Sequence, residues 1–293
     1  MSWHRRGFLA CGAALLAAPL AARAARNAEL QLMALERSLR GRIGVAALDT
    51  GSGAKISWRG EERFAMCSTF KWLLAAAVLS HCEQGILALD RRLSFAADDL
   101  RLPHSPVTTA HLREGGMRVA ALCEAAVEVS DNLAANTLLR TTGGPPALTA
   151  WLRGIGDSMT RLDRFELALN ENLPGDPRDT TTPNAMIATM RRVLLGNVLA
   201  PPSRNLLIGW MRNARTGLDR LRAGLPSAWT VGDKTGTGNG SGPTSALNDL
   251  AIAWPPKRPA IVIAAFVSGS SAPPAGQTAA HARIGRIVAT AFG

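Results

Sequence analysis

Two lysine motifs place amines and hydroxyls where an acyl-transfer reaction can use them. In Ser68-Thr69-Phe70-Lys71, the three-residue spacing on a helix puts the Lys71 amine on the same face as the Ser68 hydroxyl. Because burial lowers the pKa of a lysine, a neutral Lys71 could accept the proton of a Ser68 nucleophile at a helix N-terminus that favours an oxyanion. Alone, the motif is weak, since a Ser-x-x-Lys arises by chance about once in a chain of this length.

Lysine is scarce in this arginine-rich chain, which strengthens both motifs. The four lysines are Lys55, Lys71, Lys234 and Lys257, and the third belongs to Lys234-Thr235-Gly236 at the end of a predicted strand. There an ammonium and a hydroxyl can meet a substrate carboxylate, and Gly236 allows a ligand to approach the backbone. Taken alone, the triplet is better explained as a strand end that runs into a glycine-rich turn.

A third motif, Ser130-Asp131-Asn132, has two compatible explanations. Serine, aspartate and asparagine are the residues that cap helices, and Asp131 is expected to do so. The Ser130 hydroxyl could also pass a proton to a leaving nitrogen, while Asn132 holds a substrate amide. Three motifs in this order are more informative than any one of them.

Strands at both ends of the chain and helices between them must position these residues. Residues 42–50 and 54–58 read as a hairpin that follows a helix from about Glu29 to Leu39. Further strands are expected at 229–236, 249–255 and 260–268, before a closing helix from about Gln277 to Ala291. Helical patterns occupy 68–82, 118–129, 131–139, 145–152, 182–195 and 203–213.

This order predicts an α/β (α+β) fold with an antiparallel sheet of about five strands, flanked by the N- and C-terminal helices. Residues 25–61 and 212–293 would form the sheet domain, and 62–211 an inserted all-helical domain. The active site is expected at the interface between the two.

The first 24 residues have the pattern of an export signal. Arg5-Arg6 precede a short apolar run from Phe8 to Leu20, and small residues end the segment at Ala22-Arg23-Ala24. The paired arginines favour a twin-arginine address over an ordinary positive n-region. The run is too short to span a bilayer comfortably, so we expect a periplasmic protein without stable membrane insertion.

Composition argues against nucleic-acid partners, metals and cofactors. The net charge of +11 falls to +8 without the three signal arginines, and the remaining cations are scattered without interleaved aromatic residues, so a solvated surface is expected. An odd number of cysteines, Cys67, Cys82 and Cys123, remains, without CxxC spacing. The five histidines form no close ligand pair, so neither a metal site nor a cofactor is predicted.

The three motifs together resemble those of the penicillin-recognising serine enzymes. The segment from Arg161 to Pro183, RLDRFELALNENLPGDPRDTTTP, further resembles the Ω loop (161–179) of class A serine β-lactamases, with Glu166 and Asn170 at the positions that hold a water. The resemblance covers essentially the whole mature chain. It implies a monomeric, cofactor-free enzyme that hydrolyses penicillins and cephalosporins, confers antibiotic resistance and binds β-lactamase inhibitors.

The resemblance also assigns roles to residues. Ser68 would attack the β-lactam carbonyl, and the backbone N–H groups of Ser68 and Thr237 would form the oxyanion hole. Ser130 would protonate the leaving nitrogen. Glu166 and Asn170 would activate the water that frees the product, while either Lys71 or Glu166 could be the acylation base.

Binding and structural roles follow from the same resemblance. Lys234, Thr235 and an arginine would hold the substrate carboxylate; Arg220 is preferred over its neighbour Arg222. An Arg164–Asp179 ion pair would pin the two ends of the Ω loop, an effect that requires partial burial.

The chain departs from family patterns at several positions. Leu167 stands where proline often follows a cis peptide bond, and His104 where a tyrosine often lines the site entrance. Because Ala75 and Gly238 replace the partner cysteines of two family disulfides, neither Cys123 nor Cys67 can form its bridge.

Two other functions share part of this sequence pattern. A low-molecular-weight D,D-peptidase would have the first three motifs without the Ω-loop glutamate. A β-lactam sensor or inactive binding module would be expected to carry a membrane anchor beyond the signal.

Overall fold

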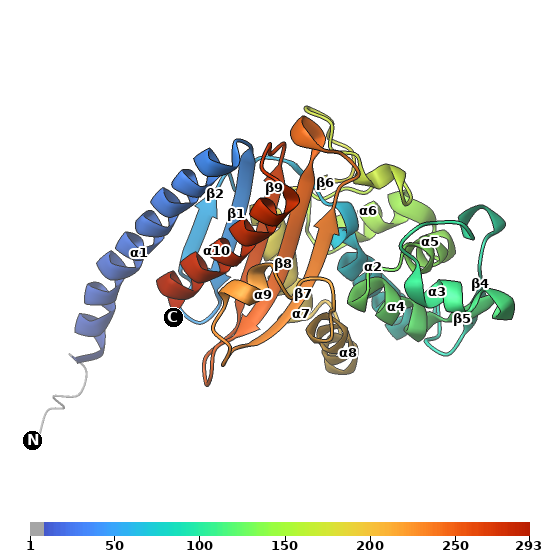
Figure 1. The fold of residues 1–293 in the computed structure, drawn as a ribbon. Coiled ribbons are helices and arrows are strands. Elements are labelled where there is room, and N and C mark those ends of the chain that lie inside the picture. Colours follow the sequence, from blue (N-terminus) through green and yellow to red (C-terminus); the bar gives the residue numbers. More distant parts are fainter. Residues whose placement is uncertain (1–8) are drawn as a thin grey trace, which may run out of the picture.

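A five-stranded antiparallel sheet forms the centre of the computed structural model, which describes residues 9–293 (Figure 1). The strand order is β2-β1-β9-β8-β7, so the N-terminal hairpin and the C-terminal strands share one sheet. This agrees with the predicted fold class. The strands are β1 (Arg42–Asp49), β2 (Lys55–Trp58), β7 (Thr230–Thr237), β8 (Ala246–Trp254) and β9 (Ile261–Ser268).

Both faces of the sheet are buried, which explains why its central strand lacks polar alternation. Along β9, Ile261 and Ile263 face one hydrophobic cluster, whereas Val262 and Ala264 face another. All residues of this strand are buried. The side-chain period of two therefore divides the molecule into two cores on either side of the sheet.

The N- and C-terminal helices cover one face of the sheet (Figure 1). These are α1 (Leu9–Leu39), α9 (Leu221–Gly224) and α10 (Pro274–Phe292). The first helix starts well before the predicted Glu29, because the preceding segment is rich in alanine and leucine, which favour helix. Within residues 9–293, no helix is both long and apolar enough to cross a membrane. The Arg5-Arg6 pair lies outside the described residues.

Helices and two small ladders fill the segment between the strands. The helices are α2 (Phe70–Glu83), α3 (Pro106–Ala110), α4 (Val119–Glu128), α5 (Asn132–Thr141), α6 (Gly144–Gly154), α7 (Pro183–Leu194) and α8 (Pro201–Arg212). The expectation of an all-helical segment was wrong in detail. Here β3 (Phe64–Ala65) pairs with β6 (Thr180–Thr181), and β4 (Arg92–Ser94) with β5 (Gly116–Arg118), in ladders too short to show a sequence period.

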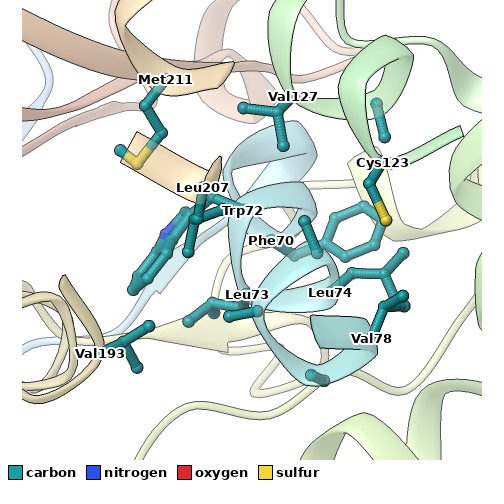
Figure 2. Close-up of a cluster of buried hydrophobic side chains, with 14 of the residues drawn as sticks. Phe70, Trp72, Leu73, Leu74, Val78, Cys123, Val127, Val193, Leu207 and Met211 are labelled. Atoms are coloured by element: carbon teal, nitrogen blue, oxygen red, sulfur yellow. The ribbon is translucent and has the colours of Figure 1, made fainter. Parts of the chain in front are cut away.

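The helix that carries the Ser-x-x-Lys motif is the centre of the second core. Figure 2 shows α2 enclosed by side chains of α4, α7 and α8, among them Val127, Val193 and Leu207. Every residue from Phe70 to Ser80 is buried. This confirms the interpretation of the helix as apolar on nearly every side, and it leaves the Lys71 side chain buried.

The Ω loop, residues 161–179, is fixed at both ends by one buried carboxylate. Asp179 Oδ2 accepts from Arg164 Nε at 2.6 Å, and Asp179 Oδ1 accepts from the backbone N–H groups of Asp163 (2.7 Å) and Arg164 (3.0 Å). The side chain of Asp179 is 0% exposed and that of Arg164 is 14% exposed. The predicted ion pair is confirmed and has the burial that it needs to matter.

Truncating α2 in its core should destabilise the fold. Leu73→Ala removes a side chain that is 0% exposed and leaves a cavity, so we expect the free energy of unfolding to fall by about 2–5 kcal/mol. Leu30→Ala, on a helix but 54% exposed, should change it by less than about 0.5 kcal/mol. Urea unfolding measures both; equal losses would contradict the assignment of α2 as the core helix.

Removing the arginine of the buried Ω-loop pair should loosen the loop. Arg164→Ala leaves the Asp179 carboxylate buried without a counter-ion, at a cost of about 3 kcal/mol. Amide exchange of residues 163–179, followed by mass spectrometry, should quicken by more than about tenfold. Arg178→Ala breaks the exposed pair with Asp176 and serves as control, with exchange expected to stay near that of the parent protein.

Candidate active site

The candidate nucleophile, Ser68, lies in a 3-10 turn, η1 (Cys67–Thr69), directly before α2. The preceding Cys67 has a φ of +48°, a conformation that is strained for a residue with a Cβ. From β8, Asn248 Nδ2 donates to the carbonyl of Met66 at 3.1 Å. The turn is thereby held against the sheet, at the boundary between the strands and the helices.

Behind Ser68, the Lys71 ammonium is enclosed by oxygen atoms. Lys71 Nζ lies 2.9 Å from Glu166 Oε1 and donates to Asn132 Oδ1 (2.6 Å) and to the Ser130 carbonyl (2.8 Å). Burial lowers the pKa of Lys71 from its ordinary value, although the Glu166 carboxylate opposes that shift. Near neutral pH a larger fraction of this buried amine than of an exposed lysine is therefore neutral and able to accept a proton.

The same carboxylate is the hydrogen-bond partner of the nucleophile. Ser68 Oγ donates to Glu166 Oε1 at 3.4 Å, whereas the described residues show no hydrogen bond between Ser68 and Lys71. The predicted proximity of the serine and the lysine is thus mediated by Glu166. Oε1 of this glutamate therefore contacts both the Ser68 hydroxyl and the Lys71 amine.

Glu166 is positioned by Asn136, a residue that sequence reasoning missed. The backbone N–H of Glu166 donates to Asn136 Oδ1 at 3.0 Å, and the carbonyl of Glu166 accepts from Asn136 Nδ2 at 3.2 Å. A cis peptide bond joins Glu166 to Leu167. The available signal was the spacing of Asn132 and Asn136, which puts both amides on one face of α5.

The second Glu166 oxygen belongs to a pair with Asn170. Asn170 Nδ2 donates to Glu166 Oε2 at 2.6 Å. Asn170 Oδ1 is buried, and none of the described residues donates a hydrogen bond to it. This leaves an oxygen that can accept from a water beside the carboxylate.

Ser130 joins the two buried lysines. Its hydroxyl oxygen is 3.4 Å from Lys71 Nζ and 3.0 Å from Lys234 Nζ, and the residue has a φ of +61°. The neighbouring Asp131 caps α5 by accepting from Ala134 N at 2.9 Å, as expected for a helix cap. Ser130 can therefore donate a proton into the cleft and recover one from either ammonium.

Asn132 has only part of its side chain free for a ligand. Its Oδ1 accepts from Lys71, and one Nδ2 hydrogen goes to the Pro103 carbonyl at 2.8 Å. The second Nδ2 hydrogen is left to interact with a substrate carbonyl. The loop that contains Pro103 and His104 forms part of the cleft wall.

The end of β7 carries the second cation. Lys234 is fully buried and donates to the Thr235 carbonyl at 2.9 Å. Burial and the neighbouring cations Lys71 and Arg220 hold the pKa of Lys234 well below its usual range. An anion bound in the cleft would offset that repulsion.

The two arginine candidates are distinguished by their partners. Arg220 lines the cleft and donates to the Gly236 carbonyl (3.1 Å) and to Thr237 Oγ1 (3.0 Å). Arg222 instead forms a buried ion pair with Asp233, beneath the strand. Of the two arginines, Arg220 is the one that shares a surface with the Lys234-Thr235-Gly236 motif.

Gly236 lines the cleft and also makes a close approach that the sequence did not indicate. A Cβ at this position would lie 2.5 Å from the Met66 carbonyl oxygen, which belongs to the residue before η1. The close approach is therefore between β7 and the turn that holds the nucleophile. The sequence had suggested a close approach by a ligand.

A cleft of about 410 Å³ opens over these groups. Lys71, Glu166 and Lys234 are buried and contact its lining from below. The lining residues are Ser68, Pro103, His104, Ser130, Asn132, Leu167, Asn170, Thr216, Arg220, Thr235, Gly236, Thr237, Gly238 and Asn239.

Asn239 ties the end of β7 to the Ω loop, a contact that the sequence did not indicate. Its backbone N–H donates to the Asn170 carbonyl at 3.1 Å, and its Nδ2 donates to the Leu167 carbonyl at 3.2 Å. The turn between β7 and β8 thus closes one wall of the cleft.

Cys67, Cys82 and Cys123 are all free thiols, as the missing partner cysteines implied.

Comparison with known proteins gives a consistent result. A model of the beta-lactamase enzyme family matches residues 27–292. The carbapenem-hydrolyzing beta-lactamase KPC of Klebsiella oxytoca is 45% identical, with 91% of this chain and 85% of the relative covered. Beta-lactamase L2 of Stenotrophomonas maltophilia is 49% identical, with 86% of each chain covered.

Solved structures agree at the level of the fold. An ancestral (GNCA) class A beta-lactamase is 54% identical with a TM-score of 0.87, covering 90% of this chain and all of the other. A beta lactamase from Xanthomonas campestris pv. campestris is 46% identical with a TM-score of 0.88, covering 92% and 99%. The family model, the relatives and the site geometry together show that this chain belongs to the class A serine β-lactamases, a family of hydrolases.

Proposed function

We propose that the protein is an exported periplasmic enzyme that hydrolyses the β-lactam ring of penicillins and cephalosporins through an acyl-enzyme on Ser68. The observation that carries the proposal is the position of Glu166. One of its oxygens faces Ser68 and Lys71, and the other is paired with Asn170. A carboxylate so placed can serve both halves of a hydrolysis that proceeds through a covalent intermediate.

Acylation begins when Ser68 Oγ attacks the β-lactam carbonyl and loses its proton to the Lys71–Glu166 pair. Either member can be the final acceptor, because Glu166 Oε1 contacts both the hydroxyl and the amine. The N–H groups of Ser68 and Thr237 stabilise the oxyanion. When the C–N bond breaks, the Ser130 hydroxyl gives its proton to the nitrogen and is reprotonated from a neighbouring lysine.

Deacylation uses a water between Glu166 Oε2 and Asn170 Oδ1. The carboxylate takes a proton from the water, whose oxygen attacks the ester carbonyl of the acyl-enzyme. The ester C–O bond then breaks, and the proton returns to Ser68 Oγ. The Asn170 Oδ1 atom supports this position for the water, because it is buried and accepts a hydrogen bond from none of the described residues.

Substrate binding is assigned to the β7 end of the cleft. Lys234, Thr235 and Arg220 would hold the substrate carboxylate, with Gly236 keeping the strand against η1. Asn132 would donate its remaining N–H to the acylamide carbonyl. β-Lactamase inhibitors that carry the same ring and carboxylate would occupy the same cleft.

The cellular setting is proposed from the same family membership and the N-terminal segment. Export by the twin-arginine route fits the Arg5-Arg6 pattern, and a monomeric state is proposed from the family resemblance. No nucleic acid and no cofactor is required for the reaction. A D,D-peptidase is the competing activity, and it lacks a glutamate in the position of Glu166.

Glu166→Ala should separate acylation from deacylation. Without the carboxylate no group deprotonates the water, so a penicillin should add its full mass to the protein, and the adduct should persist while a chromogenic cephalosporin is no longer turned over repeatedly. Intact-protein mass spectrometry follows the adduct. Ser68→Ala should form none. Unchanged turnover by Glu166→Ala would contradict its role, and persistent labelling of Ser68→Ala would contradict the nucleophile.

The fall of kcat/KM at alkaline pH should follow the deprotonation of Lys234. Burial and two neighbouring cations hold its pKa well below the usual range, so the ammonium loses its proton, and its hold on the substrate carboxylate, as pH rises through that lowered value. In Lys234→Arg the guanidinium stays charged, so the fall should move to higher pH. If the fall does not move in steady-state pH profiles, another group such as Lys71 controls it.

A further inference from the structure

A second concavity, which we call the α7 groove, lies at the opposite end of the sheet from the C-terminal end of β7, which contacts η1. It has a volume of about 750 Å³ and shares no lining residue with the catalytic cleft. Its walls come from α7, which contacts β1 and β9 on the sheet face opposite α10 (Figure 1). The lining residues are Leu48, Thr50, Lys55, Asn184, Ile187, Ala188, Arg191, Arg192, Leu195, Gly196, Trp254, Pro259 and Ala260.

The charge of the α7 groove has one sign. Lys55, Arg191 and Arg192 line it and are exposed, and no acidic residue lines it. In the part of the chain that the structure describes, none of the three side chains forms an ion pair or a hydrogen bond. Three cations without counter-ions around one concavity create a positive potential inside it.

Acidic residues near the groove are already engaged. Asp49 is buried and accepts from Arg258 at 3.2 Å. Glu61 accepts from Asn184 Nδ2 and Asp157 from Thr189 Oγ1, each at 2.7 Å, and both acids line a smaller neighbouring pocket with Arg192. They can thus reduce the charge at one side of the groove, whereas Lys55 and Arg191 face no carboxylate among its lining residues.

The floor of the α7 groove is apolar. Ile187 is 3% exposed, Leu195 is 37% exposed, and Trp254 lies half-buried beside Pro259. Cations at the rim of an apolar concavity of this volume fit a small molecule with an anionic group and a hydrophobic body. Arg191 and Arg192 also suit the C-terminal end of α7, where cations stabilise a helix. That role does not account for Lys55, which comes from β2.

We propose that the α7 groove is a second binding site, for a small organic anion with an aromatic or aliphatic body. The anionic group, a carboxylate, sulfonate or phosphate, would lie between Lys55 and the two arginines, and the body would pack on Trp254 and Ile187. Binding here needs no residue of the catalytic cleft, so it is independent of the hydrolytic reaction.

The test uses the full-length mature protein and the fluorescent probe 8-anilinonaphthalene-1-sulfonate. We expect one probe molecule in the groove, with energy transfer from Trp254 that is lost in Trp254→Phe. The double variant Arg191→Glu/Arg192→Glu should weaken binding by about tenfold or more, and added salt should weaken it in the parent protein. N-phenyl-1-naphthylamine, which has the same rings without the sulfonate, should bind more weakly. Its affinity should be the same for the parent protein and for Arg191→Glu/Arg192→Glu.

A matched control separates the groove from general surface charge. Arg283→Glu/Arg286→Glu makes the same change in net charge on α10, where both arginines are exposed on the other side of the sheet. This variant should bind the probe as the parent protein does, and circular dichroism should show that both variants fold. Equal affinity of the parent and the Arg191/Arg192 variant, or equal losses in both variants, would overturn the proposal.

Vesicles distinguish a free anion from a membrane. If the α7 groove takes single molecules, phosphatidylglycerol vesicles should not compete with the probe. Charge-dependent sedimentation with such vesicles, together with no saturable one-to-one probe binding, would instead make these cations part of a membrane-facing surface and would overturn the small-molecule site.

Discussion

The structure is organised around one buried charge, the Lys71 ammonium. An ion without contact to water is tolerated only when other groups replace its hydration, and here Glu166, Asn132 and the Ser130 carbonyl do so. Those three partners come from the Ω loop, from α5 and from the segment before α5. The contacts of the Lys71 amine therefore bring three parts of the chain together at the start of α2, next to Ser68.

The need to hold Glu166 beside Lys71 explains why the long, polar Ω loop is ordered. The Ω loop is held at its ends by Asp179, at its middle by Asn136 and at the cleft by Asn239. Each contact uses a buried or half-buried backbone group, so the loop replaces the hydrogen bonds that water would give to an exposed segment. These hydrogen bonds position the Glu166 carboxylate although it lies on a loop.

Much of the fold and most of the site could be predicted from sequence, for physical reasons. Most strands and helices are apolar segments bounded by turn and capping residues, and residues within one motif lie at spacings that a helix or strand converts into geometry, as for Ser68 and Lys71. Contacts between distant segments carry no such signal. Asn136 and Asn239 act through the backbone of the Ω loop, and the small ladders of β3 with β6 and β4 with β5 are too short to show a period.

The same limit applies to Gly236. Its lack of a side chain was visible in the sequence, but its neighbour, the Met66 carbonyl, is more than 160 residues away. Sequence could distinguish Arg220 from Arg222 only by resemblance, whereas their partners separate them physically. Arg222 is committed to Asp233, and Arg220 keeps part of its guanidinium at the cleft.

Buried acids and cations lie close together around the end of β7 that faces the cleft. Burial raises the pKa of Asp233, and burial together with Asp233 raises that of Asp249 well above its usual range. Burial and the neighbouring cations Lys71 and Arg220 hold the pKa of Lys234 below its usual range, because like charges repel one another. A carboxylate entering the cleft relieves repulsion that already exists in the free enzyme. The burial that lowers the pKa of Lys71 beside Ser68 thus also lowers that of Lys234 at the end of β7.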